Sequence, residues 1–362
     1  MKLLPEVSDC VIDHLSTDKT ALKACGLAGR QWLPRSRFHL FREVRLRVGP
    51  GLAAIGSIRD VEGYLDMEGF LEVVDASSSD IFATIQRLAV TYVGERSVGS
   101  EHLLRFSPCF QLQHLNVQLP RHQGNDAEVL HTQLASVANN WSSLSSFSLS
   151  FSIASLSVIF DIIACFPRLE QLTLLGQKMD DTIGSLAALP PRIRSLDTGI
   201  LRGGEFFFRH LLSLPTLPLF RVLKLDDEMD MRDGAPITEY LQCAGHAVQS
   251  VVLEIWTYLG VLEHLAVQHC TQLRHLIIQS YVGPFHNVSA YLSNLLSAVT
   301  SSSLSTIEIE IVNLRSWPHE LAAAANGLDR TLAHPRFNNL QRFVLCGDAL
   351  PLARGATDAS ES

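Results

Sequence analysis

Residues of the types that bind metal ions gather at two places in this chain. At the first, His264, His269, Cys270 and His275 lie close together in sequence. Imidazole and thiolate groups are common zinc ligands, but a five-residue offset puts His264 and His269 about 140° apart around a helix. The two rings would not converge on one ion. We therefore interpret these residues as surface or partly buried histidines and predict no metal site.

The second place is an acidic segment that runs from Asp226 to Asp233. A calcium-binding EF-hand loop that began at Asp226 would need glycine at its sixth position, where Met231 stands. We interpret the segment as a solvated loop that leaves a strand. A charged patch that recognises a basic partner is the alternative.

A phosphate-binding loop is a further possibility besides metal binding. Gly51 and Gly56 have its spacing, but Ser57 and Ile58 stand where Lys and then Ser or Thr are required. Without the lysine there is no cation for the phosphates, so a connector is the simpler interpretation. The sequence also lacks G-x-S-x-G and H-E-x-x-H motifs. We expect no enzyme activity and no cofactor.

Composition limits the class of partner. The 362 residues are 47% hydrophobic and 18% charged, which is typical of a folded globular protein. The net charge of −8 does not favour a nucleic acid or an anionic membrane as partner. The most apolar stretch, Leu156 to Phe166, is too short for a membrane span and contains Asp161, and the first ten residues lack a signal-peptide core. We expect a cytoplasmic or nuclear protein.

The seven cysteines are widely spaced and never form C-x-x-C, which argues against a disulfide framework and against zinc. Cys109, Cys165 and Cys270 each fall shortly before a predicted strand. We interpret these three as small buried residues at equivalent places in a repeat.

A short pattern, apolar-x-x-apolar-x-apolar, recurs along most of the chain at intervals of 24 to 36 residues. Its copies are IQRLAV at 85, LQHLNV at 112, LSSFSL at 144, LEQLTL at 169, IRSLDT at 193, FRVLKL at 220, VQSVVL at 248, LRHLII at 273, LSTIEI at 304 and LQRFVL at 340. Only Thr198 breaks the apolar rule. Each copy predicts a strand, and the even spacing predicts a repeat protein.

Amphipathic segments between these strands predict helices. They are 205–214, 236–245, 258–270 and 287–299, with a further helix expected over 68–75. The residues between the apolar strand positions are mostly polar, whereas strands of a parallel sheet covered on both faces are apolar throughout. One face of the sheet should therefore meet water. This favours a solenoid with helices on one side, and a (β/α) barrel is the main rival.

The strand pattern loosely resembles the leucine-rich-repeat family. The L-x-x-L-x-L core is present, but the Asn or Cys that follows it in regular members is replaced, for example by Gln177, Glu228, Trp256 and Tyr281. The side-chain ladder built by that residue cannot form, so repeat number and curvature do not follow from the resemblance.

The first 45 residues predict three short amphipathic helices. Leu4, Val7, Val11 and Leu15 recur at helical spacing around Pro5, which suits a first helical turn. A second helix should be capped by Thr17 or Asp18, and a third apolar cluster surrounds Trp32 and Leu33. So short a unit cannot cover all these apolar side chains by itself. It therefore indicates a docking module.

This segment resembles the F-box family in Leu4-Pro5-Glu6-Val7, Val11-Ile12-Asp13-His14-Leu15, Leu22-Lys23-Ala24-Cys25, Leu27, Arg30, Trp32 and Arg37-x-x-Leu40-Phe41-Arg42-Glu43-Val44. The resemblance implies docking on a Skp-type adaptor and, through it, on the cullin of an SCF ubiquitin ligase. Its implied adaptor contacts are Leu4, Pro5, Val7, Leu15, Leu22, Leu27 and Trp32. Gly29 replaces the usual Cys, and we expect it to weaken the second helix by about 1 kcal/mol.

The sequence thus predicts an α/β protein with an F-box over 1–46, a connector or first repeat cap over 47–80, an irregular leucine-rich-repeat solenoid over 81–346 and a disordered tail over 347–362. Its expected function is substrate recognition, without catalysis, in an SCF-type ligase. The alternative is a non-ligase scaffold whose F-box-like helices only cap the solenoid. Strand alternation places the contacts to an unknown target protein at His114, Asn116, Gln171, Thr173, Lys224, Glu254, His275, Gln279, Glu308 and Glu310.

Overall fold

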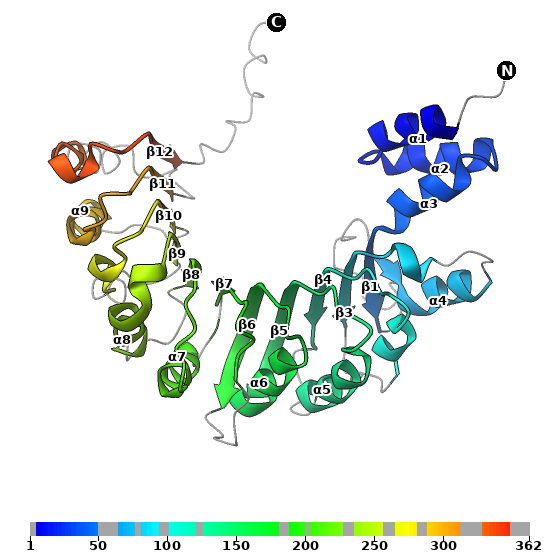
Figure 1. Ribbon diagram of the computed structural model, residues 1–362, viewed down its shortest axis with the longest axis horizontal. Helices are drawn as coiled ribbons and strands as arrows, with labels where there is room; N and C mark the ends of the chain where they lie inside the picture. Colours follow the sequence, from blue (N-terminus) through cyan, green and yellow to red (C-terminus); the bar gives the residue numbers. More distant parts are fainter. Residues whose placement is uncertain are drawn as a thin grey trace, which may run out of the picture. The chain divides into compact units, whose positions relative to one another are not determined.

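The structure is a computed structural model that describes residues 5–49, 64–76, 81–93, 101–120, 126–180, 188–199, 201, 203–226, 235–255, 265–280, 288–311 and 328–347. The chain forms two compact units, Met1–Gly176 with Asp180–Arg192 (unit 1) and Gln177–Met179 with Ile193–Ser362 (unit 2). In each unit, parallel strands alternate with helices along the chain (Figure 1). Within the described residues, no helix has the length and apolar character needed to cross a membrane.

Unit 1 begins with α1 (Pro5–His14), α2 (Lys19–Ala28) and α3 (Leu33–Phe41), together called the helical module. Asp18 caps α2, because its carboxylate accepts hydrogen bonds from the N–H groups of Thr20 and Ala21 at 3.0 and 2.9 Å. One of the two predicted capping residues is therefore confirmed.

The predicted effect of Gly29 on the second helix is wrong. Gly29 follows Ala28, the last residue of α2, and its φ of −170° is an extended conformation that any residue adopts. The cost of a glycine inside a helix therefore does not arise at this position.

The strands of unit 1 lie in the order β2-β1-β3-β4-β5-β6. They are β1 (Glu43–Val48), β2 (Leu65–Asp66), β3 (Arg87–Tyr92), β4 (His114–Gln118), β5 (Ser146–Ser155) and β6 (Gln171–Asp180). The helices are α4 (Met67–Asp75), α5 (Asp126–Val137) and α6 (Leu156–Ala164), with 3₁₀ helices η2 (Phe82–Thr84) and η3 (Leu103–Phe106). The predicted helix over 68–75 corresponds to α4.

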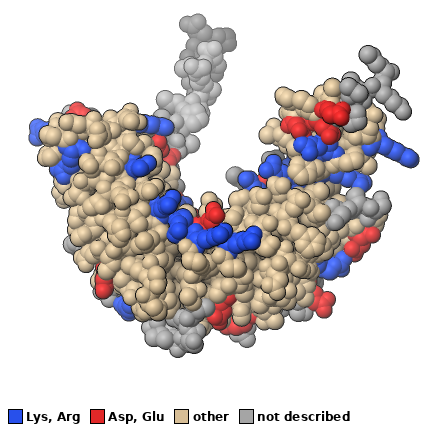
Figure 2. All heavy atoms as spheres, viewed as in Figure 1, with Lys and Arg blue, Asp and Glu red and all other residues tan. Residues whose placement is uncertain are grey.

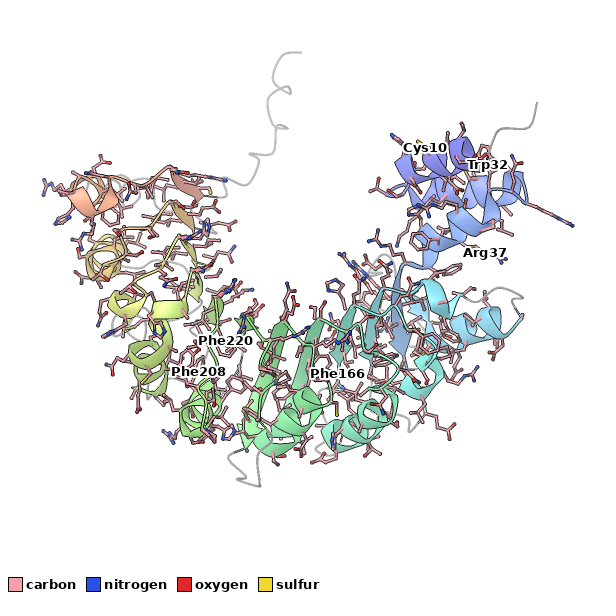
Figure 3. All side chains as sticks on the ribbon, viewed as in Figure 1. Cys10, Trp32, Arg37, Phe166, Phe208 and Phe220 are labelled. Atoms are coloured by element: carbon pink, nitrogen blue, oxygen red, sulfur yellow. The ribbon has the colours of Figure 1, made fainter. Side chains whose placement is uncertain are left out.

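The core of unit 1 lies between its strands and helices. Alternate strand residues such as Leu88 and Val90 are buried, and so are Leu130 of α5 and Ile159 of α6. Near the start of the sheet, the rings of Phe70 and Phe106 stack at 6.2 Å, and Phe41 of α3 lies 6.3 Å from Phe70. Farther along, Phe166 packs 5.7 Å from Phe147 (Figure 3). Aromatic contacts thus join the end of α3 to the core.

The strands of unit 2 follow the chain in the order β7 to β12. They are β7 (Ser195–Asp197), β8 (Val222–Asp226), β9 (Ser250–Ile255), β10 (His275–Ser280), β11 (Thr306–Ile311) and β12 (Arg342–Gly347). Helices α7 (Gly204–Ser213), α8 (Ala235–Ala244) and α9 (Val288–Ala298) connect them, with 3₁₀ helices η4 (Gly245–Ala247), η6 (Val267–His269) and η8 (Pro335–Phe337).

Tyr240 of α8 is at the centre of the aromatic core of unit 2. Its ring lies 5.5 Å from Phe208 and 5.7 Å from Phe220, both of which point into the space between helices and strands (Figure 3). Its hydroxyl donates a 2.6 Å hydrogen bond to the Pro218 carbonyl. Thr198, the exception in the repeat pattern, is fully buried, and its hydroxyl donates to the Lys224 carbonyl at 3.2 Å.

Main-chain hydrogen bonds repeat at the start of the strands. One carbonyl before a strand accepts hydrogen bonds of 2.7 to 3.1 Å from two successive N–H groups at the next strand. These carbonyls belong to Arg42, Gln86, Gln113 and Ser145 in unit 1, and to Arg194, Arg221, Gln249, Arg274 and Ser305 in unit 2. From Gln86 onward, each is the second residue of a predicted repeat copy. Main-chain groups form every step of this ladder, and the Ser145 and Ser305 hydroxyls add hydrogen bonds to the Gln113 and Arg274 carbonyls at 3.4 and 3.1 Å. No single side-chain type is therefore required at this position.

The strand pairing decides between the two predicted architectures. Every pairing whose register is known is parallel, and among the described residues β2 and β12 each have a single neighbouring strand. The sheet does not close, so the barrel alternative is wrong. The fold is α/β and leucine-rich-repeat-like, with parallel strands and connecting helices.

Two predictions about elements differ from the structure. Phe41 to Leu46 form another apolar-x-x-apolar-x-apolar copy, and β1 begins at Glu43, inside the segment assigned to the F-box, because Val44 and Leu46 are buried against the core. The predicted helix over 258–270 is not seen over 265–270, where η6 forms a 3₁₀ turn, and its first part lies outside the described residues.

Candidate protein-binding surfaces

The outward side of α1 is apolar. Val7 and Val11 are 44% and 41% exposed, and they lie one turn apart. The surface forms a shallow groove of about 510 Å³, lined by Glu6, Val7, Cys10, Val11, His14 and Leu15 and here called the α1 groove. The opposite side of the helix is buried, with Ile12 fully covered. The helical module therefore leaves an apolar surface uncovered among the described residues.

An ionic cluster holds α1 against α3. The Asp13 carboxylate accepts hydrogen bonds from Nε and Nη2 of Arg35 at 2.6 and 2.8 Å, and from Nε2 of His39 at 2.8 Å. These hydrogen bonds, Arg35 first and His39 second, hold the pKa of Asp13 well below its ordinary value. The cluster fixes the rotation of α1 and with it the direction in which the α1 groove faces.

The predicted adaptor contacts fall into three groups. Leu27 is 89% exposed, whereas Leu15 and Trp32 are half-buried. Leu22 is fully buried beneath the surface. Trp32 immediately precedes α3, and Cys10 lies on α1 (Figure 3). Leu4 lies outside the described residues, and the side chain of Pro5 is not described.

The predicted target contacts of unit 1 lie on the polar side of its strands. Asn116 and Gln171 are exposed, whereas His114 and Thr173 are half-buried. His114 lies in register with Arg87 of β3. Desolvation, and then the charge of Arg87, lowers the pKa of His114. Its imidazole is therefore neutral at physiological pH.

Four predicted contacts of unit 2 are joined to charged or polar neighbours. Lys224 pairs with Glu254 at 2.8 Å and lies 3.7 Å from Asp197. Gln279 donates a 2.9 Å hydrogen bond to Glu310. Each of these side chains is half-buried on the sheet face.

The remaining two predicted contacts of unit 2 lie nearer the starts of β10 and β11. Glu308 pairs with Arg342 at 3.2 Å, and His275 is exposed at the start of β10. The open face of unit 2 is therefore a network of opposite charges with an excess of carboxylates.

Sequence reasoning missed the arginines on the first strands of unit 1. Arg45 and Arg47 of β1 and Arg87 of β3 lie on the same polar face as His114. The alternation of charged and apolar residues from Glu43 to Val48 carries this signal. The segment assigned to the F-box includes Glu43 to Leu46, and this assignment hides the strand pattern.

Most residues considered for metal or phosphate chemistry lie outside the described residues. These are Gly51 to Ile58, Asp227 to Asp233 and His264. Where the structure describes the chain, no three His, Cys, Asp or Glu side chains come together as a possible metal site. Cys109 and Cys270 are buried as predicted, and Cys165 is half-buried.

Comparisons with known proteins show a likeness in structure alone. No protein-family model matches the chain, and no curated protein matches it. Among solved structures, it is similar to the leucine-rich repeat-containing protein LegL7 from Legionella pneumophila, with 14% identity and a TM-score of 0.38. The likeness covers 72% of this chain and 100% of that one. The class assigned to this chain, a leucine-rich-repeat-like α/β protein with an N-terminal helical module, rests on its own strand pairing.

Proposed function

We propose that this chain is a substrate-recognition subunit of an SCF-type ubiquitin ligase, working in the cytoplasm or nucleus. The helical module would dock on a Skp-type adaptor and, through it, on a cullin. The strand faces would hold a target protein. Other subunits would perform ubiquitin transfer, so this chain would contribute proximity rather than catalysis.

The α1 groove is the observation that carries the proposal. Val7 and Val11 remain partly in water although Ile12, on the same helix, is fully buried. Covering the exposed part of each valine would stabilise a complex by about 1 kcal/mol per side chain. Leu27, 89% exposed on α2, offers a further anchor. An apolar surface of this kind, held rigid by the Asp13 cluster, suits a protein partner.

Co-purification of the full chain with a Skp-type adaptor and cullin tests the proposal. The double substitution Val7→Asp and Val11→Asp puts charges into the contact, and we expect adaptor binding to fall at least about tenfold. Val73→Asp is the matched control, because Val73 is a 56% exposed valine on α4, outside the module. Thermal unfolding of both variants checks that the fold is kept.

Equal adaptor binding by the wild type and the Val7/Val11 double variant would overturn the docking site. Failure of the wild-type chain to bind any Skp-type adaptor would overturn the ligase assignment. Loss of binding in the Val73 control as well would show a general effect on the fold.

A second candidate function is a scaffold in which the helical module only caps the repeats. The main-chain ladder favours it, because the Arg42 carbonyl, directly after α3, accepts hydrogen bonds from Gln86 and Arg87 at 2.9 and 3.0 Å. An open repeat end needs such a cover. A cap alone, however, gives no reason for the exposed valines of α1. Absence of adaptor binding together with an intact fold would favour the scaffold.

A further inference from the structure

The first strands of unit 1 present a continuous polar face. On each strand, side chains that point to this face alternate with buried ones, and the strand register arranges them in three rows. The rows are Glu43-Arg87-His114-Ser146, Arg45-Ala89-Asn116-Ser148 and Arg47-Thr91-Gln118-Ser150, and together they are called the β1–β5 face.

The β1–β5 face is basic in a chain whose net charge is −8. Its cations are Arg45, Arg47 and Arg87, and Glu43 is the only carboxylate in the three rows, while Asp66 of β2, in register with Arg47, accepts the Gly69 N–H as the cap of α4. Arg45 donates hydrogen bonds to Glu43, which leaves Arg47 and Arg87 as the excess charge. Figure 2 shows Lys and Arg side chains gathered over these strands, next to the helical module.

Arg47 and Arg87 remain available to a ligand. Arg87 is exposed and Arg47 is half-buried, and neither makes an ion pair with a residue that the structure describes. In the register they lie on neighbouring strands and two rows apart. That offset corresponds to roughly 14 Å, about the distance between side chains four residues apart on an extended peptide. Two guanidinium groups at this spacing suit two carboxylates on one extended segment.

The remainder of the face supplies neutral hydrogen-bonding groups. Asn116 and Gln118 are exposed amides, and Ser146, Ser148 and Ser150 are half-buried hydroxyls. These groups both donate and accept, so they can satisfy the N–H and C=O groups of an extended backbone. The largest apolar side chain in the rows is that of Ala89. The face therefore does not suit an apolar partner helix.

We propose that the β1–β5 face binds an extended, acidic segment of a target protein. Arg47 and Arg87 would take carboxylates, and the amides and hydroxyls of β4 and β5 would take the backbone. This proposal names the kind of target that the proposed ligase subunit would recognise. The biological role of the face rests on that proposed function, but peptide binding itself requires no adaptor. A nucleic acid suits this surface less well, because the overall negative charge of the chain repels a polyanion.

The two units differ in the charged residues on their strands. The open face of unit 2 carries Asp197, Glu254, Glu308 and Glu310 against Lys224 and Arg342, and the exposed Arg194, Arg221 and Arg274 directly precede β7, β8 and β10. Substitutions of Arg47 and Arg87 therefore identify whether the β1–β5 face binds the peptides that the full chain selects.

Selection from a random-sequence peptide display library on the purified full chain tests the proposal. We expect the selected peptides to be enriched in Asp and Glu, and the enrichment to disappear in the double variant Arg47→Ala and Arg87→Ala. For a selected peptide, anisotropy titration should show binding at least about tenfold weaker to the double variant, and weaker at high salt. Arg105→Ala is the matched control, because Arg105 is an exposed arginine of unit 1 that pairs with Asp75 away from this face.

Three results would overturn the proposal: no acidic enrichment, enrichment that persists in the double variant, or equal weakening by Arg105→Ala. Tighter binding of a single-stranded oligonucleotide than of the selected peptides would assign the face to nucleic acid. Adaptor co-purification by the double variant separates the two proposals. Adaptor binding should be kept, since the substituted residues lie outside the α1 groove.

Discussion

At the scale of single residues, Asp13 determines how the helical module is held together. It joins α1 to α3 through Arg35 and His39, so the direction of the α1 groove depends on one carboxylate. Because these hydrogen bonds lower its pKa, the carboxylate stays ionised at all physiological pH values. A neutral amide at this position keeps one acceptor oxygen but loses the ion pair and the second hydrogen bond to the guanidinium.

Asp13→Asn should therefore lower the thermal unfolding temperature at neutral pH and weaken adaptor binding. The folded-state pKa lies below the unfolded value of about 3.9, so the contribution of Asp13 is full above pH 4 and is lost as the pH falls below it. Circular dichroism melting at neutral and acid pH should show a difference between wild type and variant that shrinks in acid. Glu72→Gln, which neutralises an exposed carboxylate on α4 outside the helical module, is the control. Equal effects of the two changes would contradict this role.

At the scale of elements, helix ends were easier to predict than the exposure of each leucine. Asp18 caps α2 as predicted because a short acceptor side chain at that place has one simple geometry. Leu22 and Leu27 both lie in α2, yet Leu22 is fully buried and Leu27 is 89% exposed. Their different exposure depends on how α2 packs on α3, which helical spacing alone does not specify.

The strands, like the helices, were predicted only in part by the sequence pattern. Alternation located β3 to β12, because one face of each is apolar and the other polar. It also exists at β1, where Val44 and Leu46 are buried, but the helical resemblance extended over these residues and concealed it. The basic character of the β1–β5 face was consequently missed. Which strand residues bind a target stays a prediction, since exposure is shared by many polar residues that bind nothing.

The cap of α4 allows a test at this scale. The Asp66 carboxylate accepts a 2.9 Å hydrogen bond from the Gly69 N–H at the start of the helix. Asp66→Ala should reduce the free energy of unfolding by about 1 kcal/mol. Asp75→Ala is the control at the other end of the same helix. Its ion pair with Arg105 is exposed, so the expected loss is below about 0.5 kcal/mol in urea unfolding. A larger loss for Asp75→Ala would contradict this account of α4.

At the scale of the whole molecule, the repeats explain why so irregular a sequence still folds as a repeat protein. Within each unit, most strand starts are tied to the preceding one by a main-chain carbonyl, and the core positions are filled mostly by apolar side chains. Neither requirement demands a specific residue type. The polar faces are therefore free to differ between units, basic in the first strands of unit 1 and rich in carboxylates in unit 2.

Repeats that contact mainly their neighbours should also lose stability locally. Leu276 of β10 and Leu115 of β4 are both buried strand leucines, one in unit 2 and one in unit 1, so they form a matched pair. Replacement of either by Ala should cost about 3 kcal/mol. Hydrogen exchange in Leu276→Ala should accelerate most in β9, β10 and β11, and in Leu115→Ala most in β3, β4 and β5. Equal acceleration throughout the chain in both variants would instead show that it unfolds as one cooperative whole, without the independence that nearest-neighbour contacts imply.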